Sequence, residues 1–584
     1  MARVDPFTTE IIAQTLVSAS EEMFLSWGRT SQSTIIYEVL DCACGLTDAS
    51  AQLIGQASGV PGFLGTLGPA VRSVIDKFGL DGLAPGDIIL TNDPYTGSGT
   101  HLSDVNAVMP IFYQGKIVAF AANKGHWNEI GGKALGSWGT DTTEIYQEGM
   151  QFPIIKVYEQ GHLNVAVRDM IAANCRTPAM TLGDLYAQTA SLRIGERRVL
   201  ELCEKYGVEA VLESVAHILE NGERQARQEL ARLPKGVFEA EDYLDTKSRG
   251  IEHVKGKVKI TITDDEFIVD LTGSGPQMAA PVNCSAIGAL AGVRVAYHAI
   301  LNPHAHPCEG FYRPLKFIAP PRTVFTCERP APCSCHWEPI GFLSDLVWKA
   351  LAPAVPERVS AGHFLSIIGT ILGGIEDESD QPYILCEPQA GGWGACHDRD
   401  GVSGMVSISD GETFIIPVEV AEMKYPILVE QYSFNLASGA GKFRGGYGLI
   451  RDYRLLNSNG ELTTIVSRHD TLPWPMMGGE PGSPNVVEVH HADGRKVVGS
   501  TYSQYPLRRG DLVRLITGGG AGYGDPLERD PLLVAADVRD GVIGADTARE
   551  KYGVVVDPAT WEVDEAATAS RRRTMREERG QRPR

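Results

Sequence analysis

The order of apolar and polar residues predicts that helices and strands alternate through the N-terminal part of the chain. Apolar side chains recur at helical spacing over residues 7–27, 67–79 and 181–233, which predicts helices there. Between the first two stretches, residues 34–56 contain two β-rich runs separated by "TDAS". We expect a strand pair at this point, with Asp41 inside or at the end of its first strand.

A tight β-hairpin is predicted in the same region. The runs "VNAVMPIF" and "KIVAFAA" are β-rich, and "YQGK" joins them. If Gln114 and Gly115 form a two-residue turn, paired residues have numbers that sum to about 229. Asp104 then lies opposite Gly125, which immediately precedes His126.

Beyond residue 235 the pattern changes from helical to β period. Apolar and polar residues alternate over residues 254–275, a long apolar helix is predicted over 284–301, and the chain becomes β-rich and glycine-rich from residue 427. We therefore predict a multidomain α/β (mixed α+β) protein. The expected parts are an N-terminal α/β domain (1–235) with the hairpin, a central α/β domain (236–426), a β-rich domain (427–530), two short C-terminal helices (531–570) and a disordered Arg-rich tail (571–584).

Composition narrows the classes of protein that fit. A formal net charge of -20 argues against binding of nucleic acid, because an acidic surface repels phosphate. The longest apolar runs are far short of the roughly 18 residues that cross a bilayer, so no membrane segment is expected. The eleven cysteines and a start without a signal peptide favour reduced thiols and a cytoplasmic protein.

The hairpin brings metal-ligating side chains together. In the predicted register, Asp104 and His126 are near neighbours across the two strands, and His101 precedes Asp104 in the same loop. Two imidazoles and one carboxylate form a facial ligand set that leaves positions open for water and substrate, and it suits Zn, Mn or Fe. Ordinary polar turns remain the alternative, since histidine and aspartate are common there.

Other motifs carry weaker signals. The stretches "HAHPC" and "CSCHWE" lack the second matching pair of a zinc site, although His336 and Glu338 could line an active site or an interface. No "GxxxxGK[ST]" phosphate loop is present, and no Gly-x-Ser-x-Gly elbow leads from a strand into a helix. A serine hydrolase and a nucleotide site on this chain are therefore both disfavoured.

Several motifs, in order, resemble the hydantoinase B/oxoprolinase family. They are "NDPYTGSGTHLSDV", "KGHWNEIGG", "LTGSGPQMAAPVN", "SGAGKFRGGYGLIRDYRL" and the segment that begins "GGGAGYGDPLERDP". The resemblance extends from about Pro6 to Val556. The family contains the B-type subunits of ATP-dependent lactamases, hydantoinases and 5-oxoprolinases, and the related subunits of acetone and acetophenone carboxylases.

The resemblance implies one divalent transition metal, Zn or Mn, on four ligands. They correspond to Asp41, His101, Asp104 and His126. It also implies that ATP and Mg are bound by a separate A-type subunit, in a heterotetramer of two A and two B chains.

This chain departs from the common family pattern at two positions near the site. Trp127 replaces a second histidine and Glu129 replaces an aspartate. We expect Glu129 to transfer a proton or, equally, to orient a ligand histidine by a hydrogen bond. Trp127 is a candidate for the wall of an apolar substrate pocket, with ordinary packing as the alternative.

The resemblance implies an ATP-dependent amidohydrolase that uses metal-activated water to open a small cyclic amide, such as a lactam, a hydantoin or 5-oxoproline. The short N-terminal segment favours the lactamase side of the family over the carboxylases. Two alternatives stay open at this point. One is a subunit of an ATP-dependent ketone carboxylase, and the other is a scaffold for the A-type subunit with no metal and no catalytic role.

Overall fold

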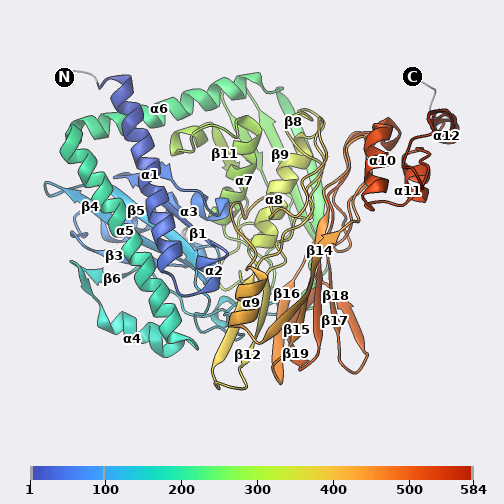
Figure 1. The fold of residues 1–584 in the computed structure, drawn as a ribbon. Helices are drawn as coiled ribbons and strands as arrows, with labels where there is room; N and C mark the ends of the chain where they lie inside the picture. Colours follow the sequence, from blue (N-terminus) through green and yellow to red (C-terminus); the bar gives the residue numbers. More distant parts are fainter. Residues whose placement is uncertain (1–3, 97–98, 581–584) are drawn as a thin grey trace.

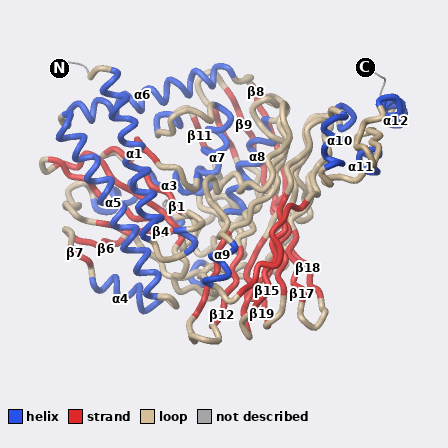
Figure 2. The backbone as a smooth tube through the Cα atoms, in the orientation of Figure 1, coloured by secondary structure: helices blue, strands red, loops and turns tan. Residues whose placement is uncertain are grey.

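The computed structural model describes residues 4–96 and 99–580, and it has the mixed α/β architecture that the sequence predicts. Long helices gather around the N-terminal sheet on one side of the molecule, and most C-terminal strands lie on the other (Figure 1, Figure 2). None of the helices in the described ranges is long and apolar enough to cross a membrane.

The predicted N-terminal helices are confirmed. Asp5 caps the N-terminus of helix α1. Its carboxylate accepts hydrogen bonds from the backbone N–H groups of Phe7 and Thr8. Gly207, with a φ of 82°, separates the two long helices of the 181–233 pattern. The bounds are α1 (Pro6–Thr30), α3 (Pro61–Phe78), α4 (Val165–Asn174), α5 (Pro178–Tyr206) and α6 (Val208–Arg232).

The strand predicted over the start of residues 34–56 is wrong. Thr34–Tyr37 forms a short helix, α2, and the strand begins only at Cys42, so Asp41 precedes β1 (Cys42–Asp48) instead of lying inside or at the end of it. The reason is a tertiary contact, because the Asp184 carboxylate accepts hydrogen bonds from the backbone N–H groups of Gln32 and Ser33. These bonds fix a turn that the local β-rich pattern does not reveal.

The first sheet is antiparallel and has the order β2-β1-β5-β4-β3-β6-β7. Cys42, Cys44 and Leu46 on one face pack in the same cluster as residues of α1 and α5. Ala43 on the other face packs with residues of α3. Both faces of the sheet are thus covered. The remaining strands are β2 (Leu53–Gln56), β3 (Ile88–Thr91), β4 (Asp104–Tyr113), β5 (Lys116–His126), β6 (Ile155–Glu159) and β7 (His162–Leu163).

The β4–β5 hairpin has the predicted turn but a shifted register at its far end. Gln114 and Gly115 both have positive φ, 51° and 80°, as a two-residue hairpin turn requires. A bulge between Ile111 and Phe112 then moves the register by one residue, so that Asp104 lies directly opposite His126. The prediction of Gly125 as the partner is wrong by that one position.

A second sheet, of order β11-β10-β9-β8, packs against α8. Its two long strands are paired antiparallel as a β8–β9 ladder, and β10 pairs with β11 in parallel. Helix α7 confirms the apolar helix predicted over residues 284–301. The bounds are β8 (Gly236–Leu244), β9 (Val254–Ile262), β10 (Phe267–Asp270), β11 (Leu315–Ile318), α7 (Ala286–Leu301) and α8 (Trp337–Leu351).

Two further sheets form the C-terminal half, with orders β13-β12-β16-β19 and β14-β15-β20-β17-β18. The first of them pairs β12 with β16 and therefore joins strands from both sides of residue 427. The division into domains stays a prediction. The bounds are β12 (Thr370–Ile375), β13 (Pro382–Glu387), α9 (Val418–Lys424), β14 (Ile427–Asn435), β15 (Gly448–Leu455), β16 (Asn459–Ile465), β17 (Val486–His490), β18 (Lys496–Gly499), β19 (Thr501–Arg508) and β20 (Leu512–Ile516).

The C-terminal helices lie to one side of the body (Figure 1). The two predicted short helices are α10 (Pro531–Arg539) and α11 (Ala545–Lys551). A third helix, α12 (Glu565–Glu578), overturns the prediction of a disordered tail for residues 571–578, because Met575 is buried and Arg572 donates to two backbone carbonyls. Residues 581–584 of that predicted tail lie outside the described residues.

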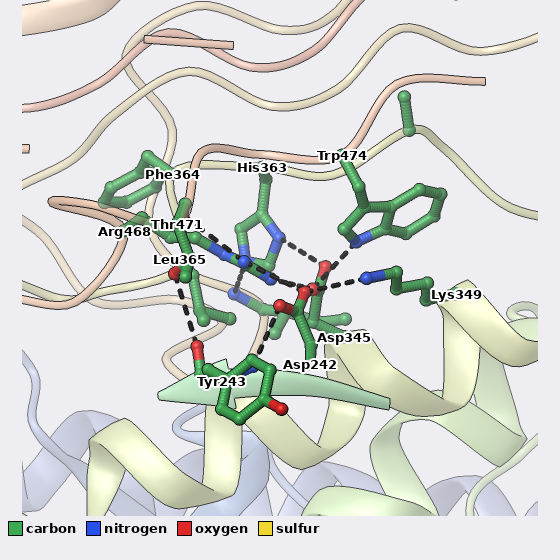
Figure 3. A network of polar contacts seen from close by, with 12 residues as sticks. Asp242, Tyr243, Asp345, Lys349, His363, Phe364, Leu365, Arg468, Thr471 and Trp474 are labelled. Atoms are coloured by element: carbon green, nitrogen blue, oxygen red, sulfur yellow. Dashed lines mark hydrogen bonds and ion pairs between the residues drawn. The ribbon is translucent and has the colours of Figure 1, made fainter. Parts of the chain in front are cut away.

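A buried polar network fixes α8 to the C-terminal loops (Figure 3). The Asp345 carboxylate, two turns into α8, accepts hydrogen bonds from Arg468 Nη2 at 2.6 Å and from Trp474 Nε1 at 2.8 Å. Arg468 also reaches Asp242 at the end of β8, with 3.1 Å between Nη1 and Oδ2. The network thereby fixes the position of α8, whose first turn carries Trp337 and Ile340 to the wall of a cavity.

Candidate metal centre

A cavity of about 50 Å³ lies where the open end of the β4–β5 hairpin meets α3, α8 and the loop after β13. That volume holds a few water molecules or an ion, since one water needs roughly 10 to 15 Å³ measured in this way. Histidines, carboxylates and hydroxyl groups line the cavity together with aromatic and aliphatic side chains. The polar residues in this wall include Asp41, His101, Asp104, His126, His336, Glu387, Ser409, Asp410 and Thr413.

The structure brings the four predicted ligands to this one cavity. His101 Nε2 lies 3.0 Å from Asp104 Oδ1, and the imidazole centroids of His101 and His126 are 5.1 Å apart. The hairpin register explains this proximity, because Asp104 and His126 are direct cross-strand partners. Asp41 reaches the same point through the backbone, since its carbonyl accepts a hydrogen bond from the His126 N–H at 3.1 Å.

His336, at the N-terminus of α8, completes the group. Its Nε2 lies 3.4 Å from Asp104 Oδ2, and its ring centroid is 4.6 Å from that of His101. Ligand atoms of His101, Asp104 and His336 all lie within 4.8 Å of one another. No other three His, Cys, Asp or Glu residues within 4–96 and 99–580 come together in this way. The sequence indicated His336 only as a residue that could line a site.

The charges of these groups suit a cation. Burial lowers the pKa of His126 to about 3, and burial together with His101 holds the pKa of His336 well below its usual value. Both imidazoles are therefore neutral and keep a lone pair for a metal. Burial alone would raise the pKa of Asp104, but His101 and His336 outweigh burial and lower it. Asp104 is thus a carboxylate.

Two further observations test whether the residues fit a metal. The Nδ1 atoms of His126 and His336 are buried and have no hydrogen-bond partner among the described residues. Burial, and then repulsion from Asp104, raises the pKa of Asp41 well above its usual value. A divalent cation would satisfy the nitrogen lone pairs and remove that repulsion. Mixed imidazole and carboxylate ligation suits Zn, Mn or Fe more than Ca or Mg.

Trp127 does not line this cavity. Its ring is fully buried, with Nε1 donating to Gln188 Oε1 at 2.9 Å and an edge contact to Phe152 at 5.7 Å between centroids. Trp127 follows the last residue of β5, and its backbone N–H donates to the Ser103 carbonyl at 2.8 Å, which fixes the chain where it leaves the strand. Phe63, Trp138 and Trp337 contribute aromatic rings to the cavity wall instead.

Glu129 also lies away from the ligand group. Its carboxylate pairs with Arg176, at 3.0 Å from Nη1, and accepts hydrogen bonds from Ser137 Oγ and the Gly131 N–H. No hydrogen bond joins it to a histidine among the described residues. The contacts assign Glu129 to holding the loop after β5, in place of proton transfer or the orientation of a ligand histidine.

The placement of Trp127 yields a testable prediction. Trp127→Phe removes the hydrogen bond to Gln188 and leaves a buried amide oxygen without that donor, so we expect a loss of about 1 to 3 kcal/mol in the free energy of unfolding. The KM for substrate should stay within twofold of wild type. Trp337→Phe, at the cavity wall, is the matched change and should alter KM more than stability. A larger KM change for Trp127→Phe than for Trp337→Phe would contradict this assignment.

Comparison with known proteins places the chain in a family. A model of the hydantoinase B/oxoprolinase family matches residues 5–526. The chain belongs to the hydantoinase B/oxoprolinase family. Within this family, it is 33% identical to the beta subunit of the caprolactamase of Pseudomonas jessenii over 98% of its own length and 100% of that chain. It is 30% identical to the B-type subunit of a putative D-/L-hydantoinase of a Pseudomonas species, over 95% of its length and 96% of that protein.

Solved structures agree with this membership. The hydantoinase B/oxoprolinase fold seen here matches the crystal structure of the ATP-dependent caprolactamase of Pseudomonas jessenii with a TM-score of 0.90 and 31% identity, over 98% of this chain and 100% of that one. A nucleotide-free structure of acetone carboxylase matches with a TM-score of 0.92 at 21% identity, over 98% of this chain and 83% of that one. The second likeness concerns the fold alone.

Proposed function

We propose that this chain is the metal-bearing B-type subunit of a two-component, ATP-dependent hydrolase that opens a cyclic amide such as a lactam, a hydantoin or 5-oxoproline. The observation that carries the proposal is the cavity in which His101, Asp104 and His126 meet, in a chain that is 33% identical over nearly its whole length to the beta subunit of a caprolactamase. The relatives' names support both the reaction class and its dependence on ATP.

The partner in this proposal supplies the nucleotide. The sequence has no "GxxxxGK[ST]" loop, and the names of two relatives mark them as one subunit of a larger enzyme, so ATP and Mg²⁺ are assigned to an A-type subunit. We propose a heterotetramer of two A and two B chains. The requirement for ATP and the eleven cysteines, none of them in a disulfide, support a cytoplasmic location.

The chain's own residues hold and shape the reaction site. We assign His101, Asp104 and His336, whose ligand atoms lie closest together, as ligands of one divalent metal, Zn or Mn, with Asp41 and His126 on the same cavity wall as further ligands. Such a metal supplies a water molecule whose pKa is lowered toward neutrality. Phe63, Trp138 and Trp337 add aromatic surface to the cavity wall, which suits the carbon atoms of a substrate ring.

A ketone carboxylase subunit is the second candidate, since the fold matches acetone carboxylase with a TM-score of 0.92. The chain co-expressed with its A-type partner separates the two. We expect ATP to be consumed with a cyclic amide alone and an amino acid to be released in a fixed ratio to ADP. Consumption of ATP only in the presence of bicarbonate and a ketone would overturn the proposal in favour of the carboxylase.

Removal of the metal tests the third possibility, a scaffold without a catalytic role. Dialysis of the complex against a chelator should abolish cyclic-amide turnover, and addition of Zn²⁺ or Mn²⁺ should restore it, because the neutral imidazoles and the Asp104 carboxylate are preformed. Turnover by a complex that contains no transition metal would mean that the cavity does not act as assigned.

A further inference from the structure

The loop after β13 supplies a second polar wall to the cavity. Ser409, Asp410 and Thr413 line the same cavity as the assigned ligands, although they lie far from the hairpin in the sequence. Because the cavity measures only about 50 Å³, a group bound beside the ligand wall also contacts this loop. Nothing in the sequence motifs pointed to these residues.

The loop is held in place by backbone contacts to the N-terminal part of the chain. The Gly62 N–H donates to the Ser409 carbonyl at 3.2 Å, and the Phe414 N–H donates to the Val39 carbonyl at 2.9 Å. Gly411 has a φ of 56°, and a Cβ there would lie 2.4 Å from Pro61 Cδ, so only glycine fits this close approach. The position of Asp410 is therefore fixed against the start of α3.

Four described residues that line the cavity carry carboxyl groups, and three of them have other roles. Asp41 and Asp104 belong to the assigned ligand set. Glu387 is occupied, because it pairs with Arg451 at 3.4 Å and accepts hydrogen bonds from Tyr453 and from the Ile416 N–H. Asp410 is the fourth.

The Asp410 side chain is loosely held by protein groups. It is 8% exposed, and the hydrogen bond that its carboxyl receives, from Thr413 Oγ1, is long at 3.5 Å. The neighbouring Ser409 Oγ is buried and has no hydrogen-bond partner among the described residues. The Asp410 carboxyl and the Ser409 hydroxyl are therefore available to form hydrogen bonds with a polar group of a substrate.

We propose that Asp410 is a further catalytic residue, the acid that protonates the ring nitrogen as the cyclic amide opens. The inference rests on the proposed function and extends it. Water adds to the amide carbon, and the partner's ATP transfers its terminal phosphoryl group to one oxygen of the adduct and leaves as ADP. The carbon–nitrogen bond then breaks and its electron pair goes to nitrogen together with the proton of the Asp410 carboxyl, while the remaining hydroxyl becomes a carbonyl and returns its proton to Asp410. A second water hydrolyses the resulting acyl phosphate to the carboxylic acid and phosphate. An amide nitrogen is a poor leaving group unless it is protonated, so loss of this proton donor should slow ring opening.

The electrostatics of the loop agree with this role. Burial raises the pKa of Asp410 to about 7, the Thr413 hydrogen bond opposes the change, and the carboxylates of Asp104 and Glu338 add to it. An acid with a pKa near the working pH can both give and regain a proton within one turnover.

The test uses the co-expressed complex with a seven-membered lactam, a hydantoin and 5-oxoproline. For Asp410→Asn we expect kcat for ring opening to fall by about 10² to 10⁴, the range for loss of a general acid, while KM and bound metal stay within about twofold of wild type. Asp410→Glu should regain at least tenfold over Asp410→Asn, because it restores a carboxyl. If Asp410→Asn fails to fold, Asp410→Ser carries the same expectation.

Two results would overturn the role of Asp410 and leave the proposed function intact. One is a kcat of Asp410→Asn within tenfold of wild type, and the other is an equal loss of kcat in Asp410→Asn and Asp410→Glu. Loss of the metal with Asp410→Asn would reassign the residue to metal binding. A wild-type complex that opens none of the three rings would instead overturn the proposed function and this role together.

Discussion

Asp104→Ala is expected to empty the metal site and to lower cyclic-amide turnover by the complex at least about 100-fold, since loss of even a supporting partner of a ligand costs 10- to 100-fold. Asp104 contacts two histidines at once, with 3.0 Å to His101 and 3.4 Å to His336. Without its carboxylate, the two imidazoles lose the group that holds them toward one point. Metal content by elemental analysis and amine release are the measurements.

The fold should survive this change. The change removes the pairs of Asp104 with His101 and His336, but it also removes the repulsion that, after burial, raises the pKa of Asp41, so the two effects on stability oppose each other. Asp87→Ala is a matched control, because Asp87 is equally buried and pairs with Lys156 at 2.8 Å, away from the cavity. Asp87→Ala should lower stability and keep the metal. If Asp104→Ala kept both the metal and turnover, the assignment of the site would be wrong.

The second large effect concerns stability. Arg468→Leu should lower the free energy of unfolding by about 3 to 5 kcal/mol, because it leaves the buried Asp345 carboxylate without its charge partner. Arg468 is 1% exposed and lies 2.6 Å from Asp345 Oδ2, in the network that anchors α8 (Figure 3). Denaturant unfolding of the purified complex measures the change.

Arg509→Leu provides the comparison at the surface. Arg509 pairs with Asp377 at 2.9 Å, but its side chain is 65% exposed, and exposed pairs contribute roughly 0 to 1 kcal/mol. Equal losses for Arg468→Leu and Arg509→Leu would mean that the network around Asp345 is not a structural anchor. Because α8 carries His336 to the cavity, Arg468→Leu should also weaken metal binding.

Local sequence patterns predicted most of the first sheet and its helices, because both depend on short-range periodicity. The turn at Gln114 and Gly115 was correct for that reason. The register beyond Ile111 was wrong by one residue, since a bulge follows from packing and leaves no mark in the apolar pattern. Likewise, α2 replaced a predicted strand because Asp184, far away in the chain, fixes the turn before it.

For the candidate site, the hairpin and the family resemblance together pointed to Asp41, His101, Asp104 and His126, which the fold gathers in one cavity. His336 and Asp410 could not be placed in this way, because they come from a helix and a loop that reach the cavity only through tertiary packing. Trp127 and Glu129 were expected at the site because they follow His126 closely in the sequence. In the structure, Trp127 instead donates a hydrogen bond to Gln188, and Glu129 forms an ion pair with Arg176.

The central claim is that this chain carries one catalytic metal at the hairpin cavity. Its most direct test is elemental analysis of the wild-type complex, purified without added metal and combined with anomalous diffraction at the metal's absorption edge. We predict one Zn or Mn ion per B chain, located at His101 and Asp104 and next to His126 and His336. A complex that opens a cyclic amide with ATP but contains no transition metal at this position would contradict the account.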